Sequence, residues 1–170
     1  MEAAELDFEI IIADVDETNP PGMPGEQVPE HLAKKKANAI EHKVKDALII
    51  AADTVVLLDH HILGKPRDAT HAREILKQLA GRTHQVVTGV CMQKGEKQIS
   101  FSVTTEVHFR PLTDEQIAHY VDHYKPYDKA GAYAIQEWIG MIGIEKINGD
   151  YYNVMGLPIG EVVKRLKEFV

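Results

Sequence analysis

The stretch from Ala47 to Leu58 constrains the fold most tightly, because it is an almost continuous apolar run with one charge, Asp53, in its middle. A run of this kind is typical of a strand buried on both faces, as in a mixed or parallel sheet. A carboxylate facing a core costs free energy, so we expect Asp53 at the carboxyl end of the strand, where α/β sheets open their ligand crevices. Spacing alone leaves two alternatives open, a catalytic or metal-binding role and a carboxylate bonded to a loop backbone.

Helical and strand patterns alternate along the rest of the chain. Apolar residues recur at helical spacing in residues 30–44, 69–79, after Thr113 and after Pro158. Gly81 is placed to end the second of these helices, and Thr113 with Gln116 has the spacing of a capping box at the start of the third. Strands are predicted at 7–15, 47–58, 84–93, 98–109, 138–147 and 151–155, the last two joined as a hairpin through Asn148-Gly149. A proline-rich loop is predicted between 17 and 29. The interleaving predicts an α/β fold, a single domain over residues 1–170 with a mixed twisted sheet flanked by helices.

Charge and composition exclude several function classes. The net charge of −7 argues against a surface that tracks nucleic-acid phosphates, although a small phosphorylated ligand needs only a few lysines and a cation. No apolar run approaches the ~18–20 residues of a membrane span, and Met1 opens no secretory signal. The single cysteine, Cys91, lies in an apolar run, which favours a buried, inert thiol and a reducing compartment. We therefore expect a cytoplasmic protein that binds neither nucleic acid nor a membrane.

Several lysines and one small-residue segment are candidate ligand contacts. Lys65 lies between Gly64 and Pro66, where a stiff backbone would hold it for phosphate binding, although a surface lysine in a turn is the commoner finding. The run 34–36 is all lysine, and one of the three would have to point inward to matter. Residues 128–136 (DKAGAYAIQ) suit backbone that approaches a ligand closely, and equally a tightly packed loop.

Histidines offer a weaker signal for a metal site. His60 and His61 are adjacent at a probable turn, and neighbours in a tight turn rarely chelate one ion. His119 and His123 are four apart on a predicted helix but lack the glutamate of a metalloprotease helix between them. We do not expect a histidine metal site.

Taken together, six segments resemble the Maf family of nucleotide pyrophosphatases. The segments are 32–37, 52–56 (ADTVV), 63–66 (LGKP), 79–84 (LAGRTH), 128–136 (DKAGAYAIQ) and 153–158 (NVMGLP). They follow the family's order and cover essentially the whole chain. The resemblance implies a Maf-like fold, similar to that of the inosine triphosphate pyrophosphatases. It also implies hydrolysis of a nucleoside triphosphate to the monophosphate and pyrophosphate.

The resemblance assigns catalytic roles by matching position. It implies that Asp53 is the general base, that Glu17, Lys36 and Lys65 assist it, and that Glu17 and Asp53 bind a divalent cation, Mg²⁺ or Mn²⁺. Lysines and a cation would offset the charge that builds on the leaving pyrophosphate. Whether Asp53 accepts the proton or only ligates the metal stays open.

A second set of positions points to the base of the nucleotide. Asp53-Thr54 and Ile135-Gln136 resemble the subgroup that takes dTTP and UTP, and the resemblance implies that Thr54, Gln136 and Lys129 bind substrate. An amide can both donate and accept, as the edge of thymine or uracil requires. Modified pyrimidine nucleotides are further candidate substrates, which would make the protein a house-cleaning enzyme. The family also implies a homodimer.

The chain departs from the family pattern in two places. The family begins with a strand and a Ser-x-Ser-Pro-Arg-Arg loop followed by a helix, and residues 1–8 match only the end of that helix. We therefore expect a chain that is truncated relative to the family and impaired in activity. The alternative is a non-catalytic nucleotide-binding regulator on the same scaffold, linked to septum formation and cell division. The second departure is His60, where the family usually has a turn glycine.

Overall fold

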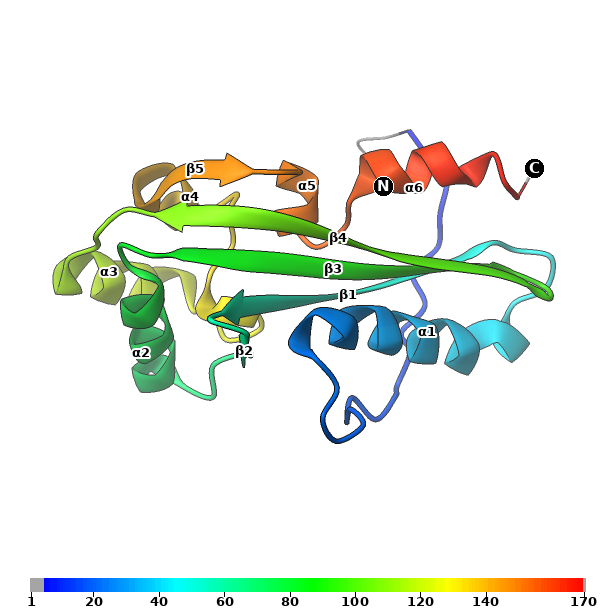
Figure 1. Ribbon diagram of the computed structural model, residues 1–170, viewed down its shortest axis with the longest axis horizontal. Helices are drawn as coiled ribbons and strands as arrows, with labels where there is room; N and C mark the ends of the chain where they lie inside the picture. The colour runs from blue at the N-terminus through cyan, green and yellow to red at the C-terminus, as the bar shows by residue number, and fades with distance from the viewer. Residues whose placement is uncertain (1–4, 170) are drawn as a thin grey trace.

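The computed structural model describes residues 5–169 and confirms the α/β class (Figure 1). A five-stranded sheet has the order β2-β1-β3-β4-β5. The strands are β1 (Ile49–Leu58), β2 (His61–Leu63), β3 (Thr83–Lys94), β4 (Lys97–Phe109) and β5 (Ile144–Asn148). The α-helices are α1 (Val28–Ile40), α2 (Ala69–Leu79), α3 (Asp114–Tyr124), α4 (Trp138–Gly143), α5 (Tyr151–Val154) and α6 (Ile159–Leu166). Short 3₁₀ turns lie at Gly25–Gln27, Glu41–Lys43 and Ala130–Ala132. No helix within residues 5–169 is both long and apolar enough to cross a membrane.

The sheet is antiparallel at each of its recorded pairings, which corrects the expected mixed sheet. The hairpin between β1 and β2 reverses the chain, and α2 then returns it so that β3 starts in the direction of β2. Both strands therefore run against β1, one on each side of it. Helix α2 thus connects β2 and β3, which run in the same direction but are not neighbours, because β1 lies between them.

Alternate residues of β1 face two different helix layers, as predicted for a strand buried on both faces. Ala51 packs in the cluster that contains Ala33 of α1, whereas Ala52 packs against the cluster that contains Val162 of α6. Helices α1 and α6 therefore cover opposite faces of the sheet (Figure 1). Strand β2 pairs only with Val56, Leu57 and Leu58, so it covers only the last part of that edge of β1.

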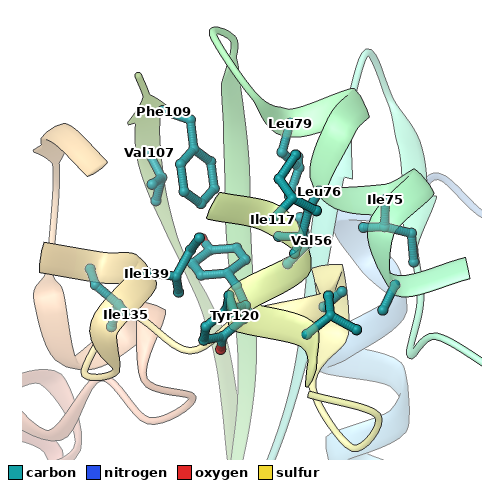
Figure 2. Packing of buried hydrophobic residues seen from close by; sticks show 14 of the residues in the cluster. Val56, Ile75, Leu76, Leu79, Val107, Phe109, Ile117, Tyr120, Ile135 and Ile139 are labelled. Atoms are coloured by element: carbon teal, nitrogen blue, oxygen red, sulfur yellow. The ribbon is translucent and has the colours of Figure 1, made fainter. Parts of the chain in front are cut away.

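The largest hydrophobic cluster lies beside α2, α3 and α4, at the end of the sheet where β1 finishes (Figure 2). It joins Val56 and Phe109 from the strands to Leu76, Tyr120 and Ile139 from the helices, each at most 3 % exposed. This cluster anchors the segment between α3 and α4, which carries the family-like residues 128–136.

Local signals at the helix ends are confirmed. Thr113 and Gln116 form the predicted capping box at the start of α3. Gly81 follows the end of α2 with φ +68°, a left-handed conformation that suits glycine. The turn between β1 and β2 places both Asp59 (φ +49°) and His60 (φ +66°) in the left-handed region. Glycine adopts a left-handed conformation without strain, which explains why a glycine suits the position of His60.

Two predicted strands are wrong, and a third, at 138–147, is wrong over its first six residues. Residues 7–15 form no strand, and Ile10 and Ile12 are 83% and 84% exposed, because this segment has no ladder partner within residues 5–169. Residues 138–143 form α4, and the following five residues form β5, which pairs with β4. Residues 151–154 form α5, because the Asp150 carboxylate accepts from the backbone N–H groups of Tyr152 and Asn153 as an N-cap. The expected match of residues 1–8 to a helix end lies partly outside the described residues.

Candidate active site

A pocket of about 340 Å³ opens between the α6 side of β1 and the loops that flank α3, α4 and α5. It is within the size range of small-molecule sites. Its lining combines charged, amide and hydroxyl groups with an apolar floor, contributed by Ala52, Asp53, Thr54, Val56, Lys65, Val86, Asp128, Lys129, Ala130, Tyr133, Ala134, Gln136, Val154, Met155 and Gly156. Five residues singled out from the sequence therefore border one cavity, namely Asp53, Thr54, Lys65, Lys129 and Gln136.

Asp53 lies in the middle of β1, opposite Gly89 of β3, and not at the carboxyl end of the strand as expected. The strand tolerates a carboxylate there because β2 covers only the far end of its open edge. At this edge Asp53 borders the pocket and also contacts α1 on the other face of the sheet. Its side chain is 14% exposed.

Lys36 is the lysine of the run 34–36 that points inward. Its ammonium lies 2.5 Å from a carboxylate oxygen of Asp53 and 3.2 Å from one of Glu17. Lys34 pairs with Glu30 on the exposed side of α1, at 3.0 Å. Lys35 donates to the backbone carbonyl oxygens of residues 16 and 18.

Glu17 reaches this cluster from the proline-rich loop ahead of α1. The loop is folded by Asp16, whose carboxylate accepts from the backbone N–H and the hydroxyl of Thr18, at 3.0 and 2.5 Å. Lys35 fastens the backbone on either side of Glu17 to α1. Glu17 itself stays 54% exposed, so a ligand can reach its carboxylate.

The electrostatics of the cluster make Asp53 a stronger base than an ordinary aspartate. Burial raises the pKa of Asp53 above its usual value, the Lys36 ammonium opposes the rise, and the Glu17 carboxylate adds to it. Burial acts to lower the pKa of Lys36, but Asp53 and Glu17 together raise it. The lysine therefore stays a cation, and the aspartate accepts a proton more readily than it would in water.

Thr54 faces the α6 side of the sheet and belongs to a buried polar chain. Its hydroxyl lies 2.9 Å from that of Thr88, which in turn donates to the carbonyl oxygen of Asn153 at 3.1 Å. Asn153 is fully buried and donates to the carbonyl of Val86 and to the hydroxyl of Thr105. This chain ties the α5 loop, which forms one wall of the pocket, to β3 and β4.

The remaining predicted residues approach the pocket from loops. Lys65 follows β2, and Gly64 at the end of β2 accepts from the backbone N–H of Gly131 at 3.2 Å. Lys129 pairs with Asp128 at 2.5 Å. A Cβ on Gly131 would lie 2.8 Å from a methyl group of Val56. Tight packing on β1 thus accounts for this glycine, while Asp128, Lys129, Ala130, Tyr133, Ala134 and Gln136 of the same segment border the pocket.

Two carboxylates are available for a divalent cation. The oxygens of Glu17 and Asp53 converge on one point, marked by the ammonium of Lys36, and hard carboxylate oxygens suit Mg²⁺ or Mn²⁺. No cluster of three His, Cys, Asp or Glu within residues 5–169 could hold a metal alone. This donor set fits a cation that also takes oxygens from a bound phosphate, as Mg²⁺ commonly does. The rings of His119 and His123 pack at a tilt of 32°, and His123 bonds the carbonyl of His119 at 2.8 Å.

Residues 153–158 were recognised as family-like, but sequence reasoning did not predict that Val154, Met155 and Gly156 form a wall of the pocket. The segment was predicted as a strand because Asn148-Gly149 is a strong hairpin signal. Asp150 was the usable clue, since an aspartate directly before a short run is a common helix N-cap. Cys91, in contrast, is fully buried as expected, and burial raises the pKa of its thiol to about 11.

Comparison with known proteins places the chain in a family. The family described as Maf-like protein matches residues 1–169. A dTTP/UTP pyrophosphatase of Cytophaga hutchinsonii is 44% identical over 168 residues, which are 99% of this chain and 77% of that protein. The protein of the same name from Parabacteroides distasonis is 46% identical, over 97% of this chain and 86% of its own length. That from Porphyromonas gingivalis is 49% identical, over 92% and 80%. The chain is a member of the Maf-like protein family.

Proposed function

We propose that this protein is a nucleoside triphosphate pyrophosphatase that converts dTTP and UTP to the monophosphate and pyrophosphate. The observation that carries the proposal is the contact of Lys36 with both Asp53 and Glu17, at the edge of a pocket that also presents Lys65 and Gln136. The relatives at 44–49% identity carry the name dTTP/UTP pyrophosphatase, which agrees with it.

The proposed reaction is displacement by water at the α-phosphorus. The carboxylate of Asp53 accepts a proton as the water oxygen bonds to phosphorus. The bond from the α-phosphorus to the α,β-bridging oxygen breaks, and its electron pair leaves on pyrophosphate. Lys36 and Lys65 offset the charge that builds on the phosphate oxygens. The raised pKa of Asp53 suits this role, because a base works best when its pKa approaches the working pH.

Glu17 and Asp53 are the residues that would hold a divalent cation. When bound, the cation supplies positive charge to the polyphosphate and lowers the pKa of a coordinated water. Lys36 keeps the two carboxylates close together, at 3.2 and 2.5 Å from its ammonium, and a cation bound by both would take the place of that ammonium. Addition of a chelator is expected to abolish turnover.

Selection of the base falls to Thr54 and Gln136. Thr88 donates its proton to the carbonyl of Asn153, so the hydroxyl of Thr54 donates either to Thr88 or to the carbonyl of Gly156, and in both cases it keeps a free lone pair. That lone pair suits the N3–H of thymine or uracil. The amide of Gln136 can donate to a carbonyl oxygen of the same edge. Adenine presents a different order of donors and acceptors, so that the polar groups of Thr54 and Gln136 would lack partners when an adenine nucleotide is bound.

Replacing Gln136 with alanine is expected to reduce the advantage of dTTP and UTP over dATP by about tenfold in kcat/KM, the effect of losing one buried hydrogen bond. The measurement is pyrophosphate release, coupled to inorganic pyrophosphatase, across a panel of nucleoside triphosphates. Gln78→Ala, at an exposed position of α2, is the matched control and should leave the preference unchanged. An unaltered preference in Gln136→Ala would refute the role in base selection.

Replacing Lys36 with glutamine is expected to move the acid limb of the kcat/KM profile to higher pH. The ammonium lowers the pKa of Asp53, so its removal raises that pKa further. Because the active form is the carboxylate, activity then appears only at higher pH. Turnover near neutral pH should also fall by roughly tenfold or more, since a phosphate-binding charge is lost. Lys34→Gln, two positions away in sequence and paired with Glu30, should keep the parent profile. A limb that stays in place in Lys36→Gln would contradict the coupling.

A further inference from the structure

The residue that selects the base, Gln136, lies in a tight turn. The backbone N–H of Glu137 donates to the carbonyl of Ala134 at 3.1 Å, which closes a four-residue turn with Gln136 as its third residue. Ala134 and Ile135 are buried, and Gln136 is exposed toward the pocket. The direction of the amide therefore depends on how the two ends of this turn are held.

One phenol oxygen holds both ends. The hydroxyl of Tyr120, in α3, accepts from the backbone N–H of Ala134 at 3.1 Å and donates to the carboxylate of Glu137. Its ring is fully buried in the cluster that contains Ile135 and Ile139 (Figure 2). Burial and the carboxylate of Glu137 raise the pKa of Tyr120, so the phenol remains a donor across the physiological range.

The packing around the turn leaves little room for other positions. A Cβ on Gly140 would overlap the carbonyl oxygen of Ile135, so α4 approaches the backbone of the turn directly. The N–H of Gly140 donates to the carbonyl of Glu137 at 3.0 Å. The turn is thus fixed from α3 through Tyr120 and from α4 through its backbone.

We propose that Tyr120 is a positioning residue for base selection, which acts by fixing the turn that aims Gln136 at the base. The inference rests on the proposed function, because it assumes that Gln136 reads the base. Tyr120 does not line the pocket, so its effect must pass through the turn. The phosphate-binding residues lie on other elements and are not held by this phenol.

Tyr120→Phe removes only the hydroxyl and keeps the buried ring. The expected result is a rise of about tenfold in KM for dTTP and UTP with kcat within about twofold of the parent, and an unchanged kcat/KM for dATP. Tyr124→Phe is the matched control, because Tyr124 stacks on Tyr120 in the same helix but its ring is 41% exposed. An unchanged preference in Tyr120→Phe, or an equal loss for every nucleotide, would overturn the proposal.

A second pair of variants covers the case in which Tyr120→Phe does not fold. Glu137→Gln keeps an oxygen that accepts from the phenol and should retain the preference, whereas Glu137→Ala should lose about as much of it as Tyr120→Phe. Tyr120→Phe added to Gln136→Ala should cause no further change in preference, since both act through one amide. Additive effects of the two substitutions would contradict the proposed route.

A failure of the positioning role of Tyr120 and a failure of the proposed function would give different results. If the parent hydrolyses dTTP with the expected preference and Tyr120→Phe matches it, only the positioning role is wrong. If the parent hydrolyses no nucleotide, the proposed function is wrong, and the comparison is made on the Kd for dTMP and dAMP by calorimetry. A narrowed binding preference in Tyr120→Phe would then support the positioning role, and an unchanged one would overturn it.

Discussion

Replacing Asp53 with asparagine is expected to lower turnover of dTTP by at least about a hundredfold, and by up to about ten-thousandfold, the range that a general base contributes. The amide keeps the shape of the side chain but cannot accept the proton of the attacking water. It also removes a negative ligand from the two carboxylates that suit a cation. Nucleotide affinity should survive, because Lys36, Lys65 and Gln136 are unchanged. Initial rates and calorimetric binding of dTTP, measured on the same preparation, separate the two effects.

Asp59→Asn is the control for this experiment. Asp59 lies at the turn after β1, is exposed and pairs with Arg82 at the surface. Its left-handed φ of +49° is one that asparagine tolerates well. Its turnover should match that of the parent. Hydrolysis of dTTP by Asp53→Asn at the parent rate would remove Asp53 from the mechanism, whatever its place in the pocket.

Replacing Gly89 with alanine is expected to have the largest effect on stability. Gly89 pairs with Asp53 across the sheet, and the first turn of α1 lies directly on it. A Cβ at Gly89 would overlap the backbone of Pro29 and Glu30, which cannot move aside as a flexible side chain can. We expect a loss of at least about 3 kcal/mol in the free energy of unfolding, or about 10 °C in Tm. The same displacement would move Lys36 away from Asp53. Activity should therefore fall by more than the loss of folded protein accounts for.

Gly160→Ala is the matched control for Gly89→Ala. Gly160 lies in α6, and a Cβ there meets nothing within 4 Å. Alanine is the better helix former, so the Tm should stay constant or rise slightly. Thermal unfolding followed by circular dichroism gives both values. A Gly89→Ala protein as stable as the parent would show that α1 does not press on the sheet at this point.

The elements that the sequence predicted well are those whose signal is local. The boundaries of α2 and the capping box at Thr113 follow from neighbouring residues alone, and both are confirmed. The long apolar run around Asp53 also revealed a strand buried on both faces. The position of Asp53 in mid-strand could not be predicted, because it depends on how far β2 extends along the edge of β1, a property of pairing and not of either strand alone.

Tertiary contacts determined the remaining parts of the site. Composition and spacing do not distinguish the three lysines of the run 34–36, and Lys36 was singled out only by the family resemblance. The crossing of α1 over the sheet brings it to Asp53. The strand predicted at 151–155 failed because a local hairpin signal competed with the cap at Asp150, and the cap prevailed. Tyr120 resembled any other buried aromatic residue of an amphipathic helix, since its partners Ala134 and Glu137 lie far along the chain.

The most direct test of the account is to identify the products of dTTP hydrolysis in ¹⁸O-labelled water. We expect ³¹P NMR to show dTMP and pyrophosphate in equal amounts, with the ¹⁸O in dTMP, because water attacks the α-phosphorus and pyrophosphate leaves. Asp53→Asn should give neither product at an appreciable rate. Formation of dTDP and phosphate would contradict the proposed bond cleavage, and binding of dTTP without any hydrolysis would indicate the non-catalytic nucleotide-binding regulator instead.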